Sequence, residues 1–149
     1  MSTVFTKIID GEIPGRFVWA DTQCVVFSTI APITDGHVLV VPRAEVEQYT
    51  DAPDALLAHL SAVAKAVGLA QQVAWGAPRA AVLVAGFEVP HLHLHVLPAW
   101  DESSLRFDSA RTDVPAAELD AAAERLRAAL HDAGHGAHVP AGLGSPALG

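Results

Sequence analysis

The chain is poor in basic residues and has no long apolar run. Its 149 residues include 9 Lys and Arg against 17 Asp and Glu, which gives a formal net charge of -8. Nucleic acids and anionic membranes both bind basic surfaces, so we expect neither as a partner. No apolar run approaches the roughly 18 residues of a membrane span. The first residues also lack the basic and apolar segments of a signal peptide.

Cysteine is almost absent. The single cysteine, Cys24, excludes an internal disulfide, and it stands in an apolar run with Val25, Val26 and Phe27. We therefore expect Cys24 to be a small buried hydrophobic side chain. These features favour a cytoplasmic protein, and none of them calls for a cofactor.

The spacing of apolar residues predicts an α+β fold. Apolar residues recurring every three or four positions predict helices, whereas alternation or short apolar runs predict strands. The helices are expected over 5–9, 54–72 and 115–131, and the strands over 17–20, 23–30, 37–41, 80–85 and 91–97. The strand over 80–85 has the composition of a strand buried on both faces. Asp51 and Asp54 are candidate caps of the long helix. The order predicts a five-stranded antiparallel sheet with a long helix and a C-terminal helix.

Residues 132–149 differ in composition from the rest, because Gly, Ala, Pro and Ser replace the periodic apolar residues. We predict one folded domain over 1–131 and a flexible tail over 132–149 that has little to bury. His131, His135 and His138 lie in or beside this tail, and we expect no functional role for them.

Residues 90–98 read Pro-His-Leu-His-Leu-His-Val-Leu-Pro. His91, His93 and His95 alternate with aliphatic residues, which is the period of a half-buried strand. Because successive side chains of a strand point to opposite faces, the three imidazoles are expected on one face, each about 6.5–7 Å from the next. The aliphatic residues between them would face the core and fix the register.

Three imidazoles on one face cannot all be protonated easily. The ordinary imidazole pKa is about 6.5, and two imidazolium ions about 7 Å apart repel by roughly 2.4 kcal/mol at an effective dielectric constant of about 20. We therefore expect at least one neutral ring that can attack phosphorus. A bound phosphate would favour protonation of the other rings, which as cations would stabilise the phosphate oxygens. Two other interpretations remain: a metal site, which His-x-His on a strand can begin, and a merely polar strand face.

Three segments spread along the chain resemble one known family. The histidine run His91-Leu92-His93-Leu94-His95-Val96-Leu97 resembles the defining motif of the histidine-triad (HIT) family of nucleotide hydrolases and transferases. The segment from Phe5 to Pro14 is similar to the family's opening segment, and the segment from Thr34 to Arg43 to its strand with Gly-His and Pro-Lys/Arg. The likeness covers residues 4–98 and implies a HIT-like α+β fold. It also implies a homodimer formed through the long helix and the neighbouring strand.

The resemblance implies a two-step reaction. His93 would attack the α-phosphorus of a nucleotide conjugate and form a nucleotidyl-histidine, from which water would release the nucleoside monophosphate. His95 would bind a phosphate oxygen, His91 would support the site and the leaving group, and His37 would complete the imidazole cluster.

The resemblance also implies a substrate pocket. The residues that match the family's apolar enclosure of base and ribose are Phe5, Ile8, Ile13, Phe27 and Ile30, for which core packing is an equally good interpretation. Thr29 stands where many relatives have an acidic residue on the ribose hydroxyls. The turn with Gly86, Phe87 and Glu88 is shorter than the family's Gly-Gln turn, and the chain has no asparagine. Relatives with a structural zinc have cysteines near the N-terminus, where this chain has Thr3 and Thr6, so we predict no zinc there.

Three hypotheses follow for the function. The first is hydrolysis or transfer at the α-phosphate of nucleotidyl conjugates such as phosphoramidates or dinucleoside polyphosphates. The second is a nucleotide-binding sensor with little turnover, and the third is a metal-dependent hydrolase. Activity that survives a chelator and is lost in His93→Ala would favour the first hypothesis. Nucleotide binding without product would favour the second. Activity that a chelator abolishes and zinc restores would favour the third.

Overall fold

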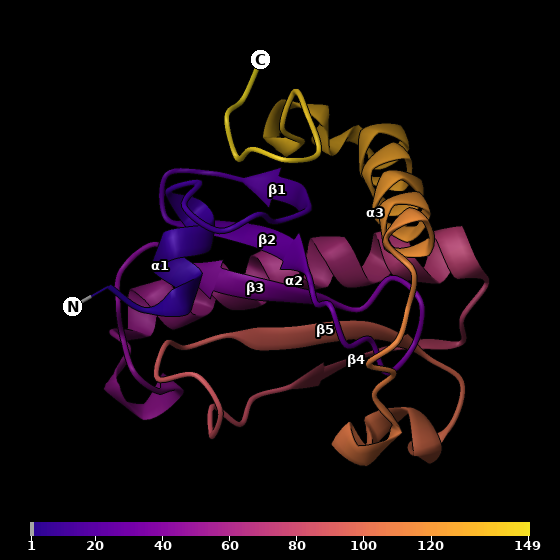
Figure 1. Cartoon of the computed structure of the whole chain (residues 1–149), viewed down its shortest axis with the longest axis horizontal. Coiled ribbons are helices and arrows are strands. Elements are labelled where there is room, and N and C mark those ends of the chain that lie inside the picture. The colour runs from indigo at the N-terminus through magenta and orange to yellow at the C-terminus, as the bar shows by residue number, and fades with distance from the viewer. Residues whose placement is uncertain (1) are drawn as a thin grey trace.

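The computed structural model describes residues 2–149, and a five-stranded antiparallel sheet forms its centre (Figure 1). The strands are β1 (Phe17–Ala20), β2 (Cys24–Ser28), β3 (Val38–Pro42), β4 (Arg79–Leu83) and β5 (Leu94–Ala99), in the spatial order β1-β2-β3-β5-β4. The helices are α1 (Val4–Ile9), α2 (Asp54–Trp75) and α3 (Ala116–Leu130), with short turns η1 (Tyr49–Asp51), η2 (Glu102–Leu105), η3 (Phe107–Ser109), η4 (His131–His135) and η5 (Gly136–His138). This arrangement confirms the predicted α+β class.

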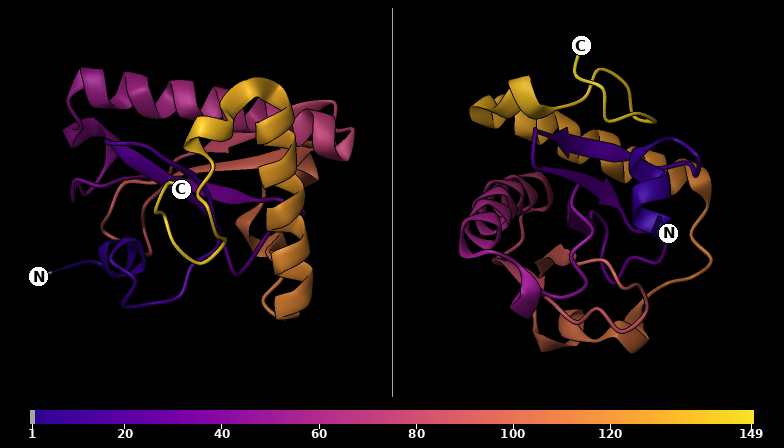
Figure 2. Two further views of the ribbon diagram at one scale, coloured as in Figure 1. Left: turned by 90° about the horizontal axis from the view of Figure 1, so that it is seen from above. Right: turned by 90° about the vertical axis from the view of Figure 1, so that its left-hand side faces the viewer.

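The two faces of the sheet pack against different helices. Val26, Val40 and Val96 are fully buried in the core that α2 covers. The opposite face carries a second, smaller core in which Phe27 and Leu39 pack with Phe5 of α1. Each fully buried valine contributes about 1.5–3 kcal/mol, so the alternating valines hold the register of the central strands. Figure 2 shows α3 crossing the end of α2, where the Arg125 guanidinium lies 5.1 Å from the centroid of the Trp75 ring.

The histidine run enters the sheet later than predicted. Leu92, Leu94 and Val96 face the α2 core, as the alternation predicts, but β5 begins at Leu94 rather than at residue 91. The cause lies in the neighbouring strand β3, which ends at Pro42, a residue with no N–H for a ladder bond. Leu92 N instead donates to Val46 O at 2.7 Å. His91 therefore lies at a bend just outside the sheet, where its N–H donates to Val89 O at 2.8 Å.

The predicted burial of the fourth strand is wrong. β4 spans Arg79–Leu83 instead of 80–85, and it is an edge strand with exposed and half-buried side chains. Val82 is 49% exposed, and within residues 2–149 no further strand pairs with the outer edge of β4. Apolar composition alone cannot distinguish such an edge from a buried strand.

The long helix α2 runs three residues beyond its predicted end and stops at Gly76, which adopts the left-handed conformation. The predicted caps are also corrected: Pro53 occupies the N-cap position, and no side chain caps the helix. Near its C-terminal end, Trp75 packs against the turn that precedes β3. A Cβ at Gly36 would lie 2.6 Å from the Trp75 ring, so only glycine allows this approach.

The C-terminal segment packs on its own chain, contrary to the expectation that it has little to bury. Val139 is buried, and Phe17 N donates to Leu143 O at 2.7 Å. The Arg127 guanidinium donates to Pro140 O at 2.8 Å, and His138 stacks on Trp19 with ring centroids 4.6 Å apart. The segment thus lies beside β1 (Figures 1 and 2). Within residues 2–149, no helix is both long and apolar enough to cross a membrane.

Candidate functional site

The middle histidine of the run is held in one tautomer. His93 Nδ1 lies 2.7 Å from the carbonyl oxygen of His91. A carbonyl can only accept a hydrogen bond, so Nδ1 carries the proton and Nε2 keeps a free lone pair. Phe5 packs edge-on against the His93 ring, with centroids 4.9 Å apart, and leaves the ring only 6% exposed. The result is a neutral, shielded imidazole with one nucleophilic nitrogen.

A second chain of hydrogen bonds fixes the tautomer of His95. Ile33 N donates to His37 Nδ1 at 3.0 Å. His37 Nε2 must therefore carry the proton, and it lies 2.9 Å from His95 Nδ1. Since His95 Nδ1 accepts, its Nε2 carries a proton that is free to donate. The two neighbouring rings, His93 and His95, have centroids 4.9 Å apart and offer a lone pair and a donor respectively.

Hydrogen bonds at both ring nitrogens hold His91 in place. Its Nε2 donates to Pro42 O at 2.7 Å, and its Nδ1 accepts from Thr3 Oγ1 at 2.6 Å. The ring is fully buried and both of its nitrogens are engaged. His91 therefore orients the carbonyl that holds His93, and its predicted support of a leaving group remains a prediction.

Burial lowers the pKa of all three clustered imidazoles. The pKa of His37 is lowered to about 3, mainly by burial and to a smaller extent by repulsion from His95. Burial and the neighbouring His93 bring the pKa of His95 to about 4. Burial also lowers the pKa of His93, although the hydrogen bond to His91 O and the Glu88 carboxylate act in the opposite direction. The rings are therefore neutral at pH 7, which agrees with the tautomers that the hydrogen bonds require.

Two adjoining cavities share Phe5, Thr29, Ile30 and Leu39, and His93 and His95 line one of them. The first has a volume of about 540 Å³ and is lined by Phe5, Thr29, Ile30, Ala31, Leu39, Ala85, Gly86, Phe87, Glu88, Val89, His93, His95 and Phe107. The second has a volume of about 260 Å³ and is lined by Val4, Phe5, Ile8, Ile13, Pro14, Gly15, Arg16, Phe27, Ser28, Thr29, Ile30 and Leu39. We name them the histidine cavity and the apolar cavity. The volume of the histidine cavity is in the range of small-molecule sites, and that of the apolar cavity lies just below this range.

The structure brings together almost all of the predicted pocket residues. The five predicted apolar residues all line the apolar cavity, and Gly86, Phe87 and Glu88 line the histidine cavity. Thr29 lies between the two cavities, and its hydroxyl accepts from Ala31 N at 3.1 Å. His37 and His91 stand behind the cavity wall rather than in it. The roles of these residues toward a substrate remain predictions.

The pattern of the sequence did not indicate three other residues of this region. Phe107 of η3 packs edge-on against His95, with centroids 4.9 Å apart. Leu39 lines both cavities and pairs with His95 across the sheet. Gln71 of α2 is fully buried, and its amide donates to Gly36 O at 2.9 Å and to Val96 O at 2.8 Å. It thereby ties the turn before His37 to β5.

Comparison with known proteins decides the family. The family model of the HIT domain matches residues 10–101. The chain belongs to the HIT family. An uncharacterised HIT-like protein of Methanocaldococcus jannaschii is 34% identical over 102 residues, which cover 66% of this chain and 79% of the relative.

Solved HIT structures share the fold over most of the chain. A zinc-bound histidine triad family protein from Mycobacterium smegmatis superimposes with a TM-score of 0.78 at 27% identity, covering 91% of this chain and 98% of the other. A hypothetical histidine triad nucleotide-binding protein from Sulfolobus tokodaii gives a TM-score of 0.77 at 27% identity, with 87% and 92% covered. These likenesses confirm the HIT-like fold that the three sequence segments predicted.

The N-terminal region of this HIT protein does not suit a zinc ion. At the positions where the family resemblance implies cysteines in zinc-holding relatives, Thr6 Oγ1 donates to Glu45 Oε1 at 2.6 Å and Thr3 Oγ1 donates to His91. Two neutral hydroxyls already engaged in hydrogen bonds are poor ligands for zinc, which prefers thiolate and imidazole. We therefore derive no chemistry from a metal there, and its absence from this region remains a prediction.

Proposed function

We propose that this HIT protein is a nucleotide hydrolase or transferase that acts at the α-phosphate of nucleotidyl conjugates. The observation that carries the proposal is the pair of fixed tautomers, a lone pair on His93 Nε2 beside a donor on His95 Nε2. Both rings line the same cavity. A nucleophile and a hydrogen-bond donor at this separation suit attack on a phosphorus atom whose oxygens need stabilisation.

The proposed reaction has two steps. His93 Nε2 forms a bond to the α-phosphorus, and the bond from phosphorus to the leaving nitrogen or oxygen breaks. The leaving group takes the electron pair and a proton from water. The positive charge that develops on His93 is stabilised by the His91 carbonyl, which accepts from Nδ1–H. In the second step water attacks the phosphorus, the nucleoside monophosphate leaves, and His93 regains its lone pair.

The apolar cavity is the proposed site for the base and ribose. Phe5 and Phe27 line it, with ring centroids 5.5 Å apart in an edge-on arrangement. Aromatic and aliphatic walls exclude water from a planar base, and the Thr29 hydroxyl can donate to the ribose. The Sulfolobus tokodaii relative is described as a nucleotide-binding protein, which supports the same assignment.

The histidine cavity favours a leaving group without negative charge. Among its lining residues, all of which lie in the described part of the chain, none is lysine or arginine, and Glu88 is the one carboxylate. A dinucleoside polyphosphate would bring several negative charges toward this carboxylate without a cation to offset them. We therefore rank phosphoramidates, whose leaving group is an amine, above dinucleoside polyphosphates.

The test is the release of nucleoside monophosphate in the presence of a chelator. Adenosine phosphoramidate and a dinucleoside polyphosphate are incubated with wild type, His93→Ala and the control His131→Ala, which changes an exposed residue outside both cavities. We expect turnover by wild type and control, and a loss of at least about 10³-fold in His93→Ala. Acid-quenched wild type should also carry nucleotide bound to histidine.

Each other result selects a different function. Nucleotide binding without product from either substrate would make the protein a sensor. Activity that the chelator abolishes and zinc restores would make it a metal-dependent hydrolase. Faster turnover of the dinucleoside polyphosphate would overturn only the ranking of leaving groups.

We also propose a homodimer, which the HIT family resemblance implies, formed through α2 and the edge strand β4. Leu69 and Val73 of α2 are 55% and 81% exposed, and Val82 of β4 is 49% exposed. A hollow of about 460 Å³ between the two elements includes Leu69 and Val82. Exposed apolar side chains gathered along an unpaired strand edge suit a second copy of the chain.

A further inference from the structure

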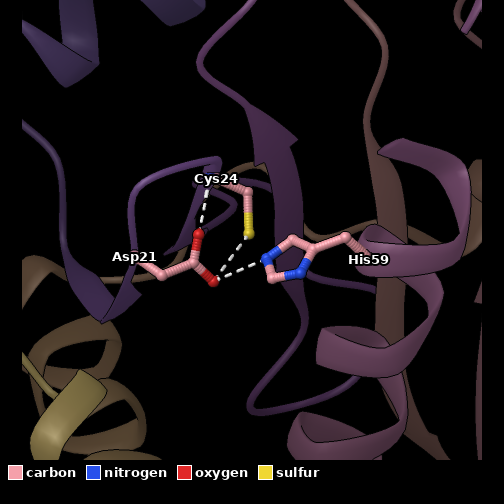
Figure 3. Close-up of side chains that lie close together, drawn as sticks. All are labelled: Asp21, Cys24 and His59. Atoms are coloured by element: carbon pink, nitrogen blue, oxygen red, sulfur yellow. Dashed lines mark hydrogen bonds and ion pairs between the residues drawn. The ribbon is translucent and has the colours of Figure 1, made fainter. Parts of the chain in front are cut away.

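A second group of reactive side chains lies outside the cavities described above. Asp21 follows β1, Cys24 opens β2, and His59 lies in the second turn of α2 (Figure 3). His59 Nε2 is 2.8 Å from Asp21 Oδ2, and Cys24 Sγ is 3.5 Å from the same oxygen. Among residues 2–149, it is the one group of three His, Cys, Asp or Glu whose ligand atoms all lie within 4.8 Å of one another.

The carboxylate of this group is held in place before any ligand binds. Asp21 Oδ1 accepts from the backbone N–H groups of Gln23 and Cys24, both at 2.8 Å. The indole of Trp19 donates to Oδ2 at 3.0 Å. The two oxygens therefore have different tasks: Oδ1 anchors the side chain, and Oδ2 faces the thiol and the imidazole (Figure 3). Such outer hydrogen bonds orient the ligands of natural metal sites.

The exposure of the three side chains also suits an ion that enters from solvent. Cys24 is fully buried, the Asp21 side chain is 10% exposed and the His59 side chain is 30% exposed. The group is thus closed on the thiol side and open on the imidazole side. A site with three protein ligands and an open fourth position has this form.

We propose that Asp21, Cys24 and His59 form a binding site for a divalent metal ion of the zinc class. Zinc binds thiolate at about 2.3 Å and imidazole or carboxylate at about 2.0–2.2 Å, which requires the three ligand atoms to lie about 3–4 Å apart. The distances of 2.8 and 3.5 Å need only a small opening of the pair between Asp21 and His59. On binding, the thiol of Cys24 releases its proton to solvent, and the proton on His59 Nε2 moves to Nδ1.

Burial and the Asp21 carboxylate raise the pKa of the Cys24 thiol, so the thiolate forms only together with the bound ion. The Cys24 thiolate and the Asp21 carboxylate together carry two negative charges, which a divalent ion neutralises. Arg43 is the opposing cation, because its Nε donates to the backbone oxygen of Asp21 at 2.9 Å. That bond involves the backbone oxygen of Asp21 and does not occupy Oδ2.

The position of the site gives it a structural role. Cys24 lies at one end of β2, whereas Ser28, at the other end, lines the apolar cavity. The ion would join the turn between β1 and β2 to the first turns of α2, which the sequence connects only through a long segment. It would not touch the histidines of the proposed reaction.

The test uses cobalt as a spectroscopic substitute for zinc on the full-length, metal-free protein. We expect one equivalent of Co²⁺ to give a charge-transfer absorption from the Cys24 sulfur, and one equivalent of Zn²⁺ to displace it. Cys24→Ser should abolish this absorption. His59→Gln, a change at a partly exposed position, should weaken Co²⁺ binding by at least about ten-fold. His93→Ala and His131→Gln serve as controls, and both should keep the sulfur absorption and the Co²⁺ affinity of wild type.

The outcomes decide the proposal even if the buried Cys24→Ser variant fails to fold. A wild type without sulfur absorption would overturn it, as would a His59→Gln variant that binds Co²⁺ as tightly as wild type. Zn²⁺ should also raise the melting temperature of wild type more than that of His59→Gln. Equal shifts in the two proteins would assign the ion to another site.

Discussion

Backbone groups, rather than other side chains, decide which nitrogen of each reactive histidine carries the proton. The His91 carbonyl fixes His93, and the Ile33 amide fixes His37 and, through it, His95. Backbone groups do not titrate, so these tautomers persist at every pH at which the rings stay neutral. The residue that determines reactivity is then the one that controls solvent access, and for His93 this is Phe5.

The first prediction concerns the pH dependence of kcat/KM for the phosphoramidate. Burial lowers the pKa of His93, so the neutral nucleophile persists below the ordinary imidazole pKa of about 6.5. Activity should therefore stay constant from pH 8 through about 6.5 and fall only at more acidic pH. Phe5→Ala admits water, favours the charged ring and raises the pKa of His93, so the fall should move to higher pH.

Ile13→Ala is the control for this profile. Ile13 lines the apolar cavity, so its loss should raise KM without moving the acid limb. An acid limb at the same pH in wild type and Phe5→Ala would show that this ring does not set the protonation of His93.

At the scale of elements, one buried side chain of α2 aligns two parts of the site. Gln71 donates to a carbonyl of the turn before β3 and to a carbonyl of β5. The turn carries His37, and β5 carries His95, whose rings share a hydrogen bond. The helix therefore sets the distance between the two imidazoles as well as covering the sheet.

The second prediction is that Gln71→Leu lowers the free energy of unfolding by about 1–3 kcal/mol, because two carbonyls lose their amide donor inside the core. Urea denaturation measures the change. The control is Gln72→Leu, whose amide binds Pro78 O at the surface, and its effect should be under about 0.5 kcal/mol. Equal losses in both variants would contradict a specific role for Gln71.

The sequence pattern predicted an element well where buried and exposed side chains alternate along it. It predicted poorly what depends on contacts between residues far apart in the sequence. The aliphatic residues between the histidines determine which face His95 occupies, and that face could be predicted from the period of two. The role of His91 could not, since it depends on Thr3, 88 positions away. The start of β5 depends likewise on Pro42 in the neighbouring strand. For β4, the composition gave no sign that the strand lies at an edge.

At the scale of the whole molecule, the C-terminal segment completes the fold. Arg127 of α3 donates to Phe17 O and to Pro140 O, both at 2.8 Å, and so joins α3, β1 and the segment. The composition of residues 132–149 concealed this, because the segment contributes backbone carbonyls and one buried valine rather than a periodic apolar face.

The third prediction is that deletion of residues 139–149 lowers the free energy of unfolding by about 3 kcal/mol or more. The deletion removes the buried Val139 and leaves the Arg127 guanidinium without Pro140 O. Removing only residues 148–149 is the control and should change stability by less than about 0.5 kcal/mol. Chemical denaturation of wild type and the two deletion variants measures both changes in stability. An unchanged midpoint for the longer deletion would contradict the packing of residues 139–149 on the rest of the fold.

The fourth prediction concerns assembly. Sedimentation should give wild type twice the 15.6 kDa mass of one chain, and Val73→Glu should give the mass of one chain, because it places a charge on a face that a second copy covers. Val73 is 81% exposed, so the substitution leaves the monomer intact. Leu105→Glu, on η2, is the control and should remain a dimer. A monomeric wild type would refute the proposed interface.

Because His138 stacks on Trp19, the fluorescence of Trp19 reports whether the C-terminal segment is docked beside β1. The indole of Trp19 also donates to Asp21, so a single fluorophore contacts both the docked C-terminal segment and the carboxylate of the proposed metal site. Detachment of the segment should alter the emission of Trp19 through the face of its ring, and binding of an ion should alter it through the Nε1–H at the ring edge. Docking of the C-terminal segment and binding of the ion, both remote from His93, can thus be followed in real time without any added label.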